Sequence, residues 1–366
     1  MTSRFVRTLL VLAALVPSLA AQNDSIAILK GETLVIEGSA GIDELYLRIA
    51  DRAVDGDDPA VSVEIEPGTG STVNGSVEPA VFDGVRKLRV SLGDGADYLY
   101  FDAFEFGKNP MLLDLGAGDD EVVVGETKAG AIKVIAGAGN DTVRFPFCNV
   151  GATRVSDSSG ALYMLAAFGT FEQLKVTSGP ESDEVWFENI EVALHLALDT
   201  GDGDDQIDIP YCSVAGKAVF KLGPGNNRFT STGALLGKSA VIMASDGDDE
   251  VDLGHWNVGT SLSARLGAGQ NTFSLVTEPD PASIGDDLRY TGGGEDDIVD
   301  IHAYPIGHDA RIVLKGGANA VTLTDCSIGK DLRVSAGAGD DSVQLPGTTI
   351  GGKQLIQLDG GNNTEP

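Results

Sequence analysis

The sequence predicts an all-β protein: a right-handed parallel β-helix, or β-solenoid, of about 13 coils with an irregular, β-rich N-terminal cap. Two observations predict this fold. Gly-rich turns recur at a period near 22 residues, and stretches of alternating apolar and polar residues lie between them. Because a solenoid grows along one axis, a length of 366 residues does not by itself require two globular domains.

Residues 1–21 have the pattern of a signal peptide. Arg4 and Arg7 give a basic start, an apolar run covers 9–16, and small residues at 18–20 form a cleavage site. The apolar run is too short to span a membrane, and no later run is apolar enough to do so. We therefore expect an exported protein, secreted or held at the cell surface, whose mature chain begins near Ala21 or Gln22.

The chain is strongly acidic. It has 55 acidic and 25 basic residues, and loss of Arg4 and Arg7 changes the net charge from −30 to −32. This charge argues against nucleic acid, anionic membranes and acidic polysaccharides as direct partners, and it favours cations. Solubility of a long secreted rod is the alternative reason for the same charge. The sequence does not specify an oligomeric state.

Residues 22–91 form the expected cap, because a solenoid must cover its first open edge. Short strands are expected at 34–36, 45–47, 61–65 and 85–90, between loops rich in Gly, Pro and Asn. Asn74-Gly75 predicts a hairpin turn within this segment. The turn at 38–43 is a degenerate copy of the later repeat.

Residues 92–366 form the regular array, in which Thr200–Leu222 shows one repeat. A Gly-Asp turn is followed by Ile207 and Ile209 alternating with polar residues, then by a second turn and a second alternating stretch. We expect two or three short parallel strands per coil, paired with coils about 4.8 Å above and below. The strong preference of parallel crossovers predicts a right-handed coil.

The second Gly of each turn, replaced once by Glu181, marks thirteen copies: Gly95, Gly118, Gly139, Gly160, Glu181, Gly203, Gly225, Gly247, Gly269, Gly294, Gly317, Gly339 and Gly361. Four residues later an apolar column is predicted: Leu99, Val122, Val143, Met164, Val185, Ile207, Phe229, Val251, Phe273, Ile298, Val321 and Val343. Two residues after the marker stands a column of Asp and Asn: Asp97, Asp120, Asp141, Leu162, Asp183, Asp205, Asn227, Asp249, Asn271, Asp296, Asn319, Asp341 and Asn363.

Two interpretations of the Asp and Asn column remain open. Asp and Asn bond nearby backbone N–H groups in turns, and an Asn between stacked carboxylates doubles the spacing of the charges, so a metal-free structural solenoid explains the pattern. Alternatively, carboxylates and exposed turn carbonyls are ligands for Ca²⁺. The candidate metal ligands are Asp97, Asp119, Asp120, Asp141, Asp204, Asp205, Asp248, Asp249, Asp296, Asp340 and Asp341.

At these turns the chain resembles the hemolysin-type calcium-binding repeats of the RTX (repeats-in-toxin) family. The shared pattern, Gly-x-Gly-x-Asp-x-apolar, occurs at 93–99, 116–122, 137–143, 201–207 and 337–343. The resemblance implies an exported protein with Ca²⁺ bound at the turns of a parallel β-roll. The family repeats about every nine residues, with two such turns per coil, and is exported without a cleaved N-terminal signal. This chain differs on each of these points.

The three cysteines test the stacking. Cys148, Cys212 and Cys326 fall in one column but three and five coils apart, too far for a disulfide bond, so we expect buried free thiols.

A carbohydrate-active enzyme, a polysaccharide lyase or hydrolase, is the alternative function. Such a site needs acids clustered with Arg or Lys on one outer face, whereas Arg144, Arg228, Arg265 and Arg333 lie in different coils. We therefore expect a non-catalytic solenoid that is a structural or binding component of a cell surface or matrix. The chain stops at Pro366 inside a new turn, so either Glu365-Pro366 blunts the last edge or the sequence is a fragment.

Overall fold

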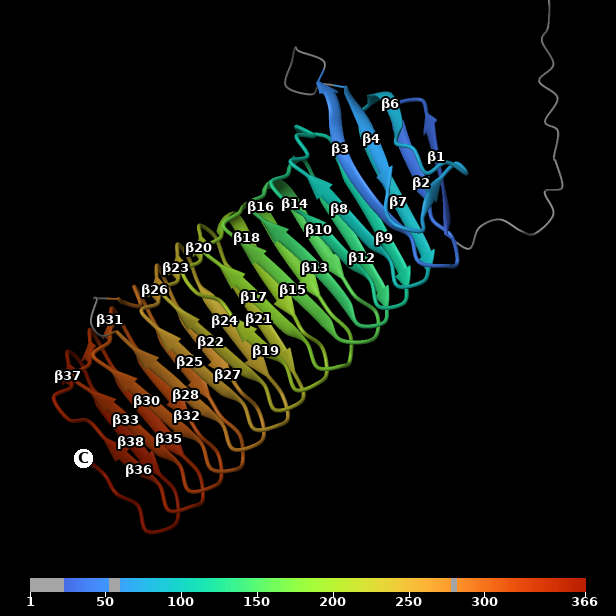
Figure 1. The fold of residues 1–366 in the computed structure, drawn as a ribbon. Helices are drawn as coiled ribbons and strands as arrows, with labels where there is room; N and C mark the ends of the chain where they lie inside the picture. Colours follow the sequence, from blue (N-terminus) through green and yellow to red (C-terminus); the bar gives the residue numbers. More distant parts are fainter. Residues whose placement is uncertain (1–22, 53–59, 278–281) are drawn as a thin grey trace, which may run out of the picture.

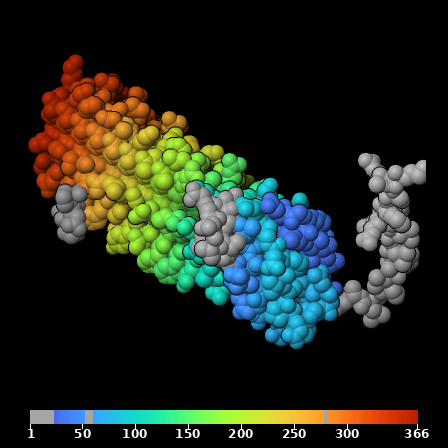
Figure 2. Space-filling model, turned by 90° about the horizontal axis from the view of Figure 1, so that it is seen from above, coloured from blue at the N-terminus to red at the C-terminus, as the bar shows by residue number. Residues whose placement is uncertain are grey.

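The computed structural model describes residues 23–52, 60–277 and 282–366, so the predicted signal peptide lies outside the described residues. Within these ranges the chain consists of strands without a helix, stacked side by side along a straight rod (Figures 1 and 2). The predicted all-β solenoid is confirmed, with about 12 turns. The described part of the chain contains no helix with the length and apolar character needed to cross a bilayer.

Each coil contributes one strand to a first face of the rod, a 15-stranded sheet. Its strands are β3 (Glu44–Arg52), β4 (Val61–Pro67), β6 (Ala80–Val85), β8 (Tyr98–Asp102), β10 (Glu121–Val124), β13 (Asp141–Pro146), β15 (Leu162–Ala167), β17 (Glu184–Glu188), β19 (Gln206–Asp208), β22 (Arg228–Thr232), β25 (Glu250–Gly254), β28 (Thr272–Val276), β30 (Ile298–His302), β33 (Ala320–Thr324) and β36 (Ser342–Gln344).

The second face is formed by β2 (Thr33–Glu37), β7 (Lys87–Asp94), β9 (Met111–Ala117), β12 (Ile132–Ala138), β14 (Asn149–Ser156), β16 (Thr170–Thr177), β18 (Glu191–Asp199), β21 (Ala218–Gly223), β24 (Ala240–Ala244), β27 (Leu262–Arg265), β29 (Leu288–Thr291), β32 (Ala310–Val313), β35 (Leu332–Ala336) and β38 (Gln354–Leu358). Short strands between the faces are β11 (Lys128–Ala129), β20 (Ser213–Val214), β23 (Leu235–Leu236), β26 (Asn257–Val258), β31 (Pro305–Ile306), β34 (Ser327–Ile328) and β37 (Thr349–Ile350).

One continuous core runs along the rod, because alternate side chains of each strand point inward. On the first face Val122 pairs with Leu99 in the preceding coil and with Val143 in the next, and all three are fully buried. Aromatic rings also pack in this core: Trp256 packs against Phe220 and Phe229, with ring centroids 6.1 and 6.0 Å apart. The predicted apolar column is thus the interior of the solenoid.

One position of that column was predicted wrongly. Phe273 pairs with Val299, not with Ile298, and Val299 is fully buried while Ile298 is 51% exposed. The turn before β30 therefore holds one residue more than the predicted spacing allowed.

The segment predicted as the N-terminal cap differs from the regular array because several of its strands are antiparallel. β1 (Asp24–Lys30) pairs antiparallel with β2, and β4 pairs antiparallel with β3 and β6. β5 (Thr72–Val73) ends at the predicted hairpin turn, which is confirmed: Asn74 and Gly75 both have positive φ, and Val73 and Ser76 exchange backbone hydrogen bonds. β2 and β3 pair in parallel with β7 and β8, so the coils begin within this segment.

The three cysteines are free and buried, as predicted. Burial raises the pKa of Cys148 and Cys212 to about 12, which keeps both thiols protonated and unreactive.

Candidate functional site

The Gly-rich turns join the second face to the first, and glycine is required there for two reasons. Gly118 has a φ of +135°, a conformation that other residues rarely adopt. A Cβ atom on Gly118 would also lie 1.6 Å from the carbonyl oxygen of Gly95 in the preceding coil. Successive turns therefore stack backbone on backbone, and this close stacking places the Asp and Asn side chains of neighbouring coils beside one another.

One Asp or Asn per turn, buried at every position except the half-buried Asn363, forms a column that we call the inner ladder: Asp43, Asp97, Asp120, Asp141, Asp183, Asp205, Asn227, Asp249, Asn271, Asp297, Asn319, Asp341 and Asn363, with Leu162 at the one apolar position. From Asp97 onward, Oδ1 of every Asp and Asn in the ladder accepts the backbone N–H of the ladder residue one coil earlier. These bonds are 2.7–3.2 Å long.

The residue before each ladder position forms a second, exposed column, the outer ladder: Asp119, Asn140, Ser182, Asp204, Asn226, Asp248, Asp296 and Asp340. Its oxygens accept N–H groups from the following coil. For example, Asp119 Oδ1 accepts the N–H of Asn140 in the following coil at 2.8 Å, whereas Asp120 Oδ1 accepts the N–H of Asp97 in the preceding coil at 2.8 Å. The adjacent acids expected to act as pairs therefore reach in opposite directions along the rod.

The predicted place of Asp296 in the inner column is wrong. Asp297 takes the inner position, because its Oδ1 accepts the N–H of Asn271 at 3.2 Å, and it is fully buried. Asp296 lies in the outer ladder, where its Oδ1 accepts the N–H of Ala318 at 2.6 Å. The cause is the extra residue in the turn before β30, which shifts the register by one.

The second carboxylate oxygen of most inner Asp residues has no hydrogen-bond partner among the described residues. These buried oxygens are Oδ2 of Asp97, Asp120, Asp141, Asp183, Asp205, Asp249 and Asp341. A buried oxygen of this kind is costly unless a proton or a cation satisfies it. The ladder thus contains a row of unsatisfied carboxylate oxygens, which is the chemical feature on which a cation site would depend.

The Asn residues of the inner ladder show which groups lie beside the position that Oδ2 occupies in Asp. Asn227 Nδ2 donates to the carbonyl of Gly225 at 3.1 Å and to Asp249 Oδ1 at 2.9 Å. Asn271 and Asn319 repeat both bonds with their own turn glycines and with the next Asp. Since Asp Oδ2 takes the place of this amide nitrogen, a proton on Oδ2 would face the same glycine carbonyl.

The pKa values of the ladder carboxyls agree with this geometry. Burial raises the pKa of Asp97, Asp120, Asp205 and Asp249 to about 7, and that of Asp183 to about 6. Burial also raises the pKa of Asp141 and Asp297. Removal from water disfavours the charged form, and the neighbouring carboxylates add repulsion in the runs without Asn.

Sequence reasoning missed one carboxyl of this group. Asp157 follows β14 in the coil where Leu162 interrupts the ladder, it is 8% exposed, and neither of its oxygens has a hydrogen-bond partner among the described residues. Burial raises its pKa to about 7, and Asp141 and Asp183 raise it further by repulsion. The turn pattern could not reveal Asp157, because it lies five residues before the ladder position.

The described residues contain no group of three or more His, Cys, Asp or Glu side chains placed to hold a metal ion, so a cation here would need backbone carbonyls as well. No protein-family model matches this sequence, and no curated protein and no solved structure matches it either.

Proposed function

We propose that this chain is an exported, non-catalytic β-solenoid that acts as a structural or binding component of a cell surface or extracellular matrix. The observation that carries the proposal is the continuous parallel register from β3 to β36 around a single core. Such a rod offers long, regular outer faces to its surroundings. The signal-peptide pattern of residues 1–21 supports export.

We also propose that Ca²⁺ binds at the inner ladder, in the coils where Asp follows Asp: Asp97, Asp120 and Asp141, then Asp183 and Asp205. Their unpaired Oδ2 atoms lie in coils about 4.8 Å apart, at the position where Asn227 Nδ2 contacts a turn glycine carbonyl in a later coil, and oxygen ligands suit Ca²⁺. In the later coils every second position is an Asn, whose Nδ2 is a hydrogen-bond donor and cannot coordinate a cation.

Thermal melting with Ca²⁺ or with chelator tests this assignment. Ca²⁺ at 100 times its Kd should stabilise the fold by about 2.7 kcal/mol and raise Tm. Asp120→Asn should reduce that gain, because the amide replaces a ligand oxygen. The matched control is Asp249→Asn, which lies in the alternating coils and should leave the gain unchanged.

An unchanged melting curve at millimolar Ca²⁺ would reject the metal and leave the metal-free ladder. If Asp120→Asn and Asp249→Asn lose the Ca²⁺ response equally, the proposal that Ca²⁺ binds only in the Asp-rich coils is wrong. Release of sugar products from a panel of polysaccharides would contradict the non-catalytic assignment and favour a lyase or hydrolase.

A further inference from the structure

One outward-facing column on the second face is basic although the chain is acidic. The strand register aligns Val35, Arg89, Leu112, Lys133, Arg154, Lys175, Ala197, Val219, Val241, Ser263, Arg289, Arg311, Arg333 and Leu355. We call its seven Arg and Lys residues the basic file. Since 25 of 366 residues are basic, about one would be expected among these fourteen positions, and none of the fourteen is acidic.

The first dense part of the basic file is Lys133, Arg154 and Lys175, in three consecutive coils. All three side chains are exposed. The residues two positions before and after them, which point outward on the same strands, carry no charge: Ala131, Ala152, Gln173, Ile135, Ser156 and Thr177. Like charges stacked about 4.8 Å apart repel one another, and an anion bound across these three side chains would reduce that repulsion.

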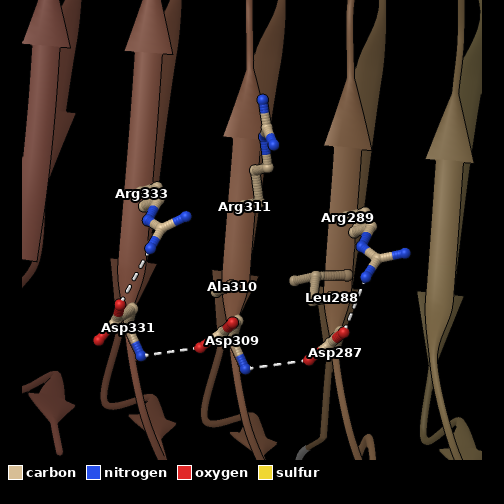
Figure 3. Close-up of a pocket in the computed structure, with 8 residues that line it drawn as sticks. All are labelled: Asp287, Leu288, Arg289, Asp309, Ala310, Arg311, Asp331 and Arg333. Carbon is tan, nitrogen blue, oxygen red and sulfur yellow. Dashed lines mark hydrogen bonds and ion pairs between the residues drawn. The ribbon is translucent and has the colours of Figure 1, made fainter. Parts of the chain in front are cut away.

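The second dense part is Arg289, Arg311 and Arg333, again in three consecutive coils (Figure 3). Arg289 donates to Asp287 at 2.9 Å and Arg333 to Asp331 at 3.1 Å. Arg311 instead points along its strand, away from Asp309, and forms no ion pair with any described residue (Figure 3). A groove of about 430 Å³ beside these residues is lined by Arg265, Arg289 and Arg311.

The net charge of the whole chain argues against acidic polysaccharides, but this column is locally basic. We propose that the basic file binds a linear acidic polysaccharide, with carboxylate or sulfate groups, lying along the rod axis. Guanidinium groups bind planar oxyanions with two parallel hydrogen bonds, and lysines add point charges. The file is straight because each coil repeats the register of the one before, so it suits a partner that is itself extended and repeating. The proposal deepens the binding role given above and rests on it.

Charge favours a polysaccharide over a nucleic acid as the occupant. A duplex carries one negative charge per about 1.7 Å and presents it around its whole circumference. The remaining surface of a chain with net charge −30 would repel so dense a polyanion. A single polysaccharide strand can present its anionic groups along one line, as the basic file presents its cations.

Direct binding measurements on the full mature chain test the proposal, with polygalacturonate and dextran sulfate as probes and neutral dextran as the reference. Two triple variants remove the dense parts: Lys133→Gln/Arg154→Gln/Lys175→Gln and Arg289→Gln/Arg311→Gln/Arg333→Gln. The matched control, Arg48→Gln/Arg144→Gln/Arg228→Gln, removes the same charge from the first face. Circular dichroism and Tm establish that each variant folds.

Each file variant should weaken binding at least about tenfold, while the control should change it less than about twofold. Binding should fall as salt rises, and the tighter of the two probes identifies the anion as carboxylate or sulfate. Absence of binding to both acidic polymers at low salt would overturn the proposal. So would an equal loss in the control, or tighter binding of a DNA duplex. Rod formation and the Ca²⁺ response of Tm are separate readouts, so the proposed function can stand if polymer binding fails.

Discussion

The inner ladder has two halves that share one backbone geometry and differ in a single atom. From Asp97 to Asp205 the ladder is almost entirely Asp, whereas from Asp205 onward Asp and Asn alternate. In both halves Oδ1 accepts the N–H of the preceding coil. In the second half Nδ2 of Asn227, Asn271 and Asn319 donates to a turn glycine carbonyl and to the next Asp, while in the first half an unpaired oxygen takes its place.

The comparison shows that stacking geometry and charge compensation are separate requirements. The turn backbone accepts Asp and Asn equally well, because both supply Oδ1. Only the amide also supplies a donor to the glycine carbonyl and to the next Asp. The Asp-rich half must therefore obtain a proton or a cation from solution, and the alternating half obtains part of its compensation from its own side chains.

The largest expected effect on this comparison is that of pH, measured in chelator, because it acts on several carboxyls together. Unfolded Asp has a pKa near 3.9, while the folded pKa of Asp97 and Asp120 is about 7. Between these values the folded chain holds protons that the unfolded chain has released. The stability that these protonated carboxyls contribute should therefore be greatest below about pH 4 and should be lost above about pH 7. Between these values the free energy of unfolding should decline by about 1.4 kcal/mol per pH unit per carboxyl at the steepest.

Amide hydrogen exchange resolves the two halves at each pH. Protection in β10 and β13 should fall more steeply with pH than protection in β25 and β33, since the first half holds more carboxyls with raised pKa. Parallel declines in both halves would show that the Asn residues do not reduce the cost of the buried carboxyls.

The next effect tests what the halves share. Gly118→Ala and Gly225→Ala place a Cβ 1.6 and 1.9 Å from the glycine carbonyl of the preceding coil, at φ values of +135° and +124°. Both substitutions should cost about 3–5 kcal/mol, measured as the shift of the urea midpoint. A much smaller cost in one half would mean that its turns are not held by backbone stacking.

The smallest expected effect comes from a substitution that makes the alternating half resemble the Asp-rich half. Asn227→Asp removes the Nδ2 bonds to Gly225 and Asp249 and makes an uninterrupted run of carboxyls with Asp205. We expect a loss of about 1–3 kcal/mol at neutral pH and a smaller loss near pH 4, where a protonated Asp can donate. Asn226→Asp, in the exposed outer ladder, is the control and should change stability by less than about 0.5 kcal/mol. If both variants lose the same stability, the loss comes from general charge repulsion and not from the missing Nδ2 hydrogen bonds.

The turn before β30 shows the limit of spacing arguments. The 22-residue period predicted the columns correctly for most coils, since Val122, Ile207 and Phe229 all lie in the core. At 292–297 the sequence offers three consecutive Gly followed by Glu-Asp-Asp, and spacing alone could not decide which Asp turns inward. The structure selects Asp297, because Val299 rather than Ile298 then enters the core.

The basic file shows a different limit. Arg289, Arg311 and Arg333 are 22 residues apart, so the period contains the information needed to align them. Counting basic residues by coil made them look scattered, and the net charge of −30 described the surface as if it were uniform. Only alignment of outward positions across coils separates one basic column from its acidic surroundings.

The sequence by itself determined the all-β solenoid, its period, the apolar interior and the buried free cysteines, because a repeat encodes contacts between residues one period apart. Tertiary structure alone decided the directions in which adjacent Asp residues reach, the entry of Asp157 beside the ladder and the antiparallel pairing of the cap. These features depend on how strands and turns pack in three dimensions, and the same local pattern permits more than one arrangement.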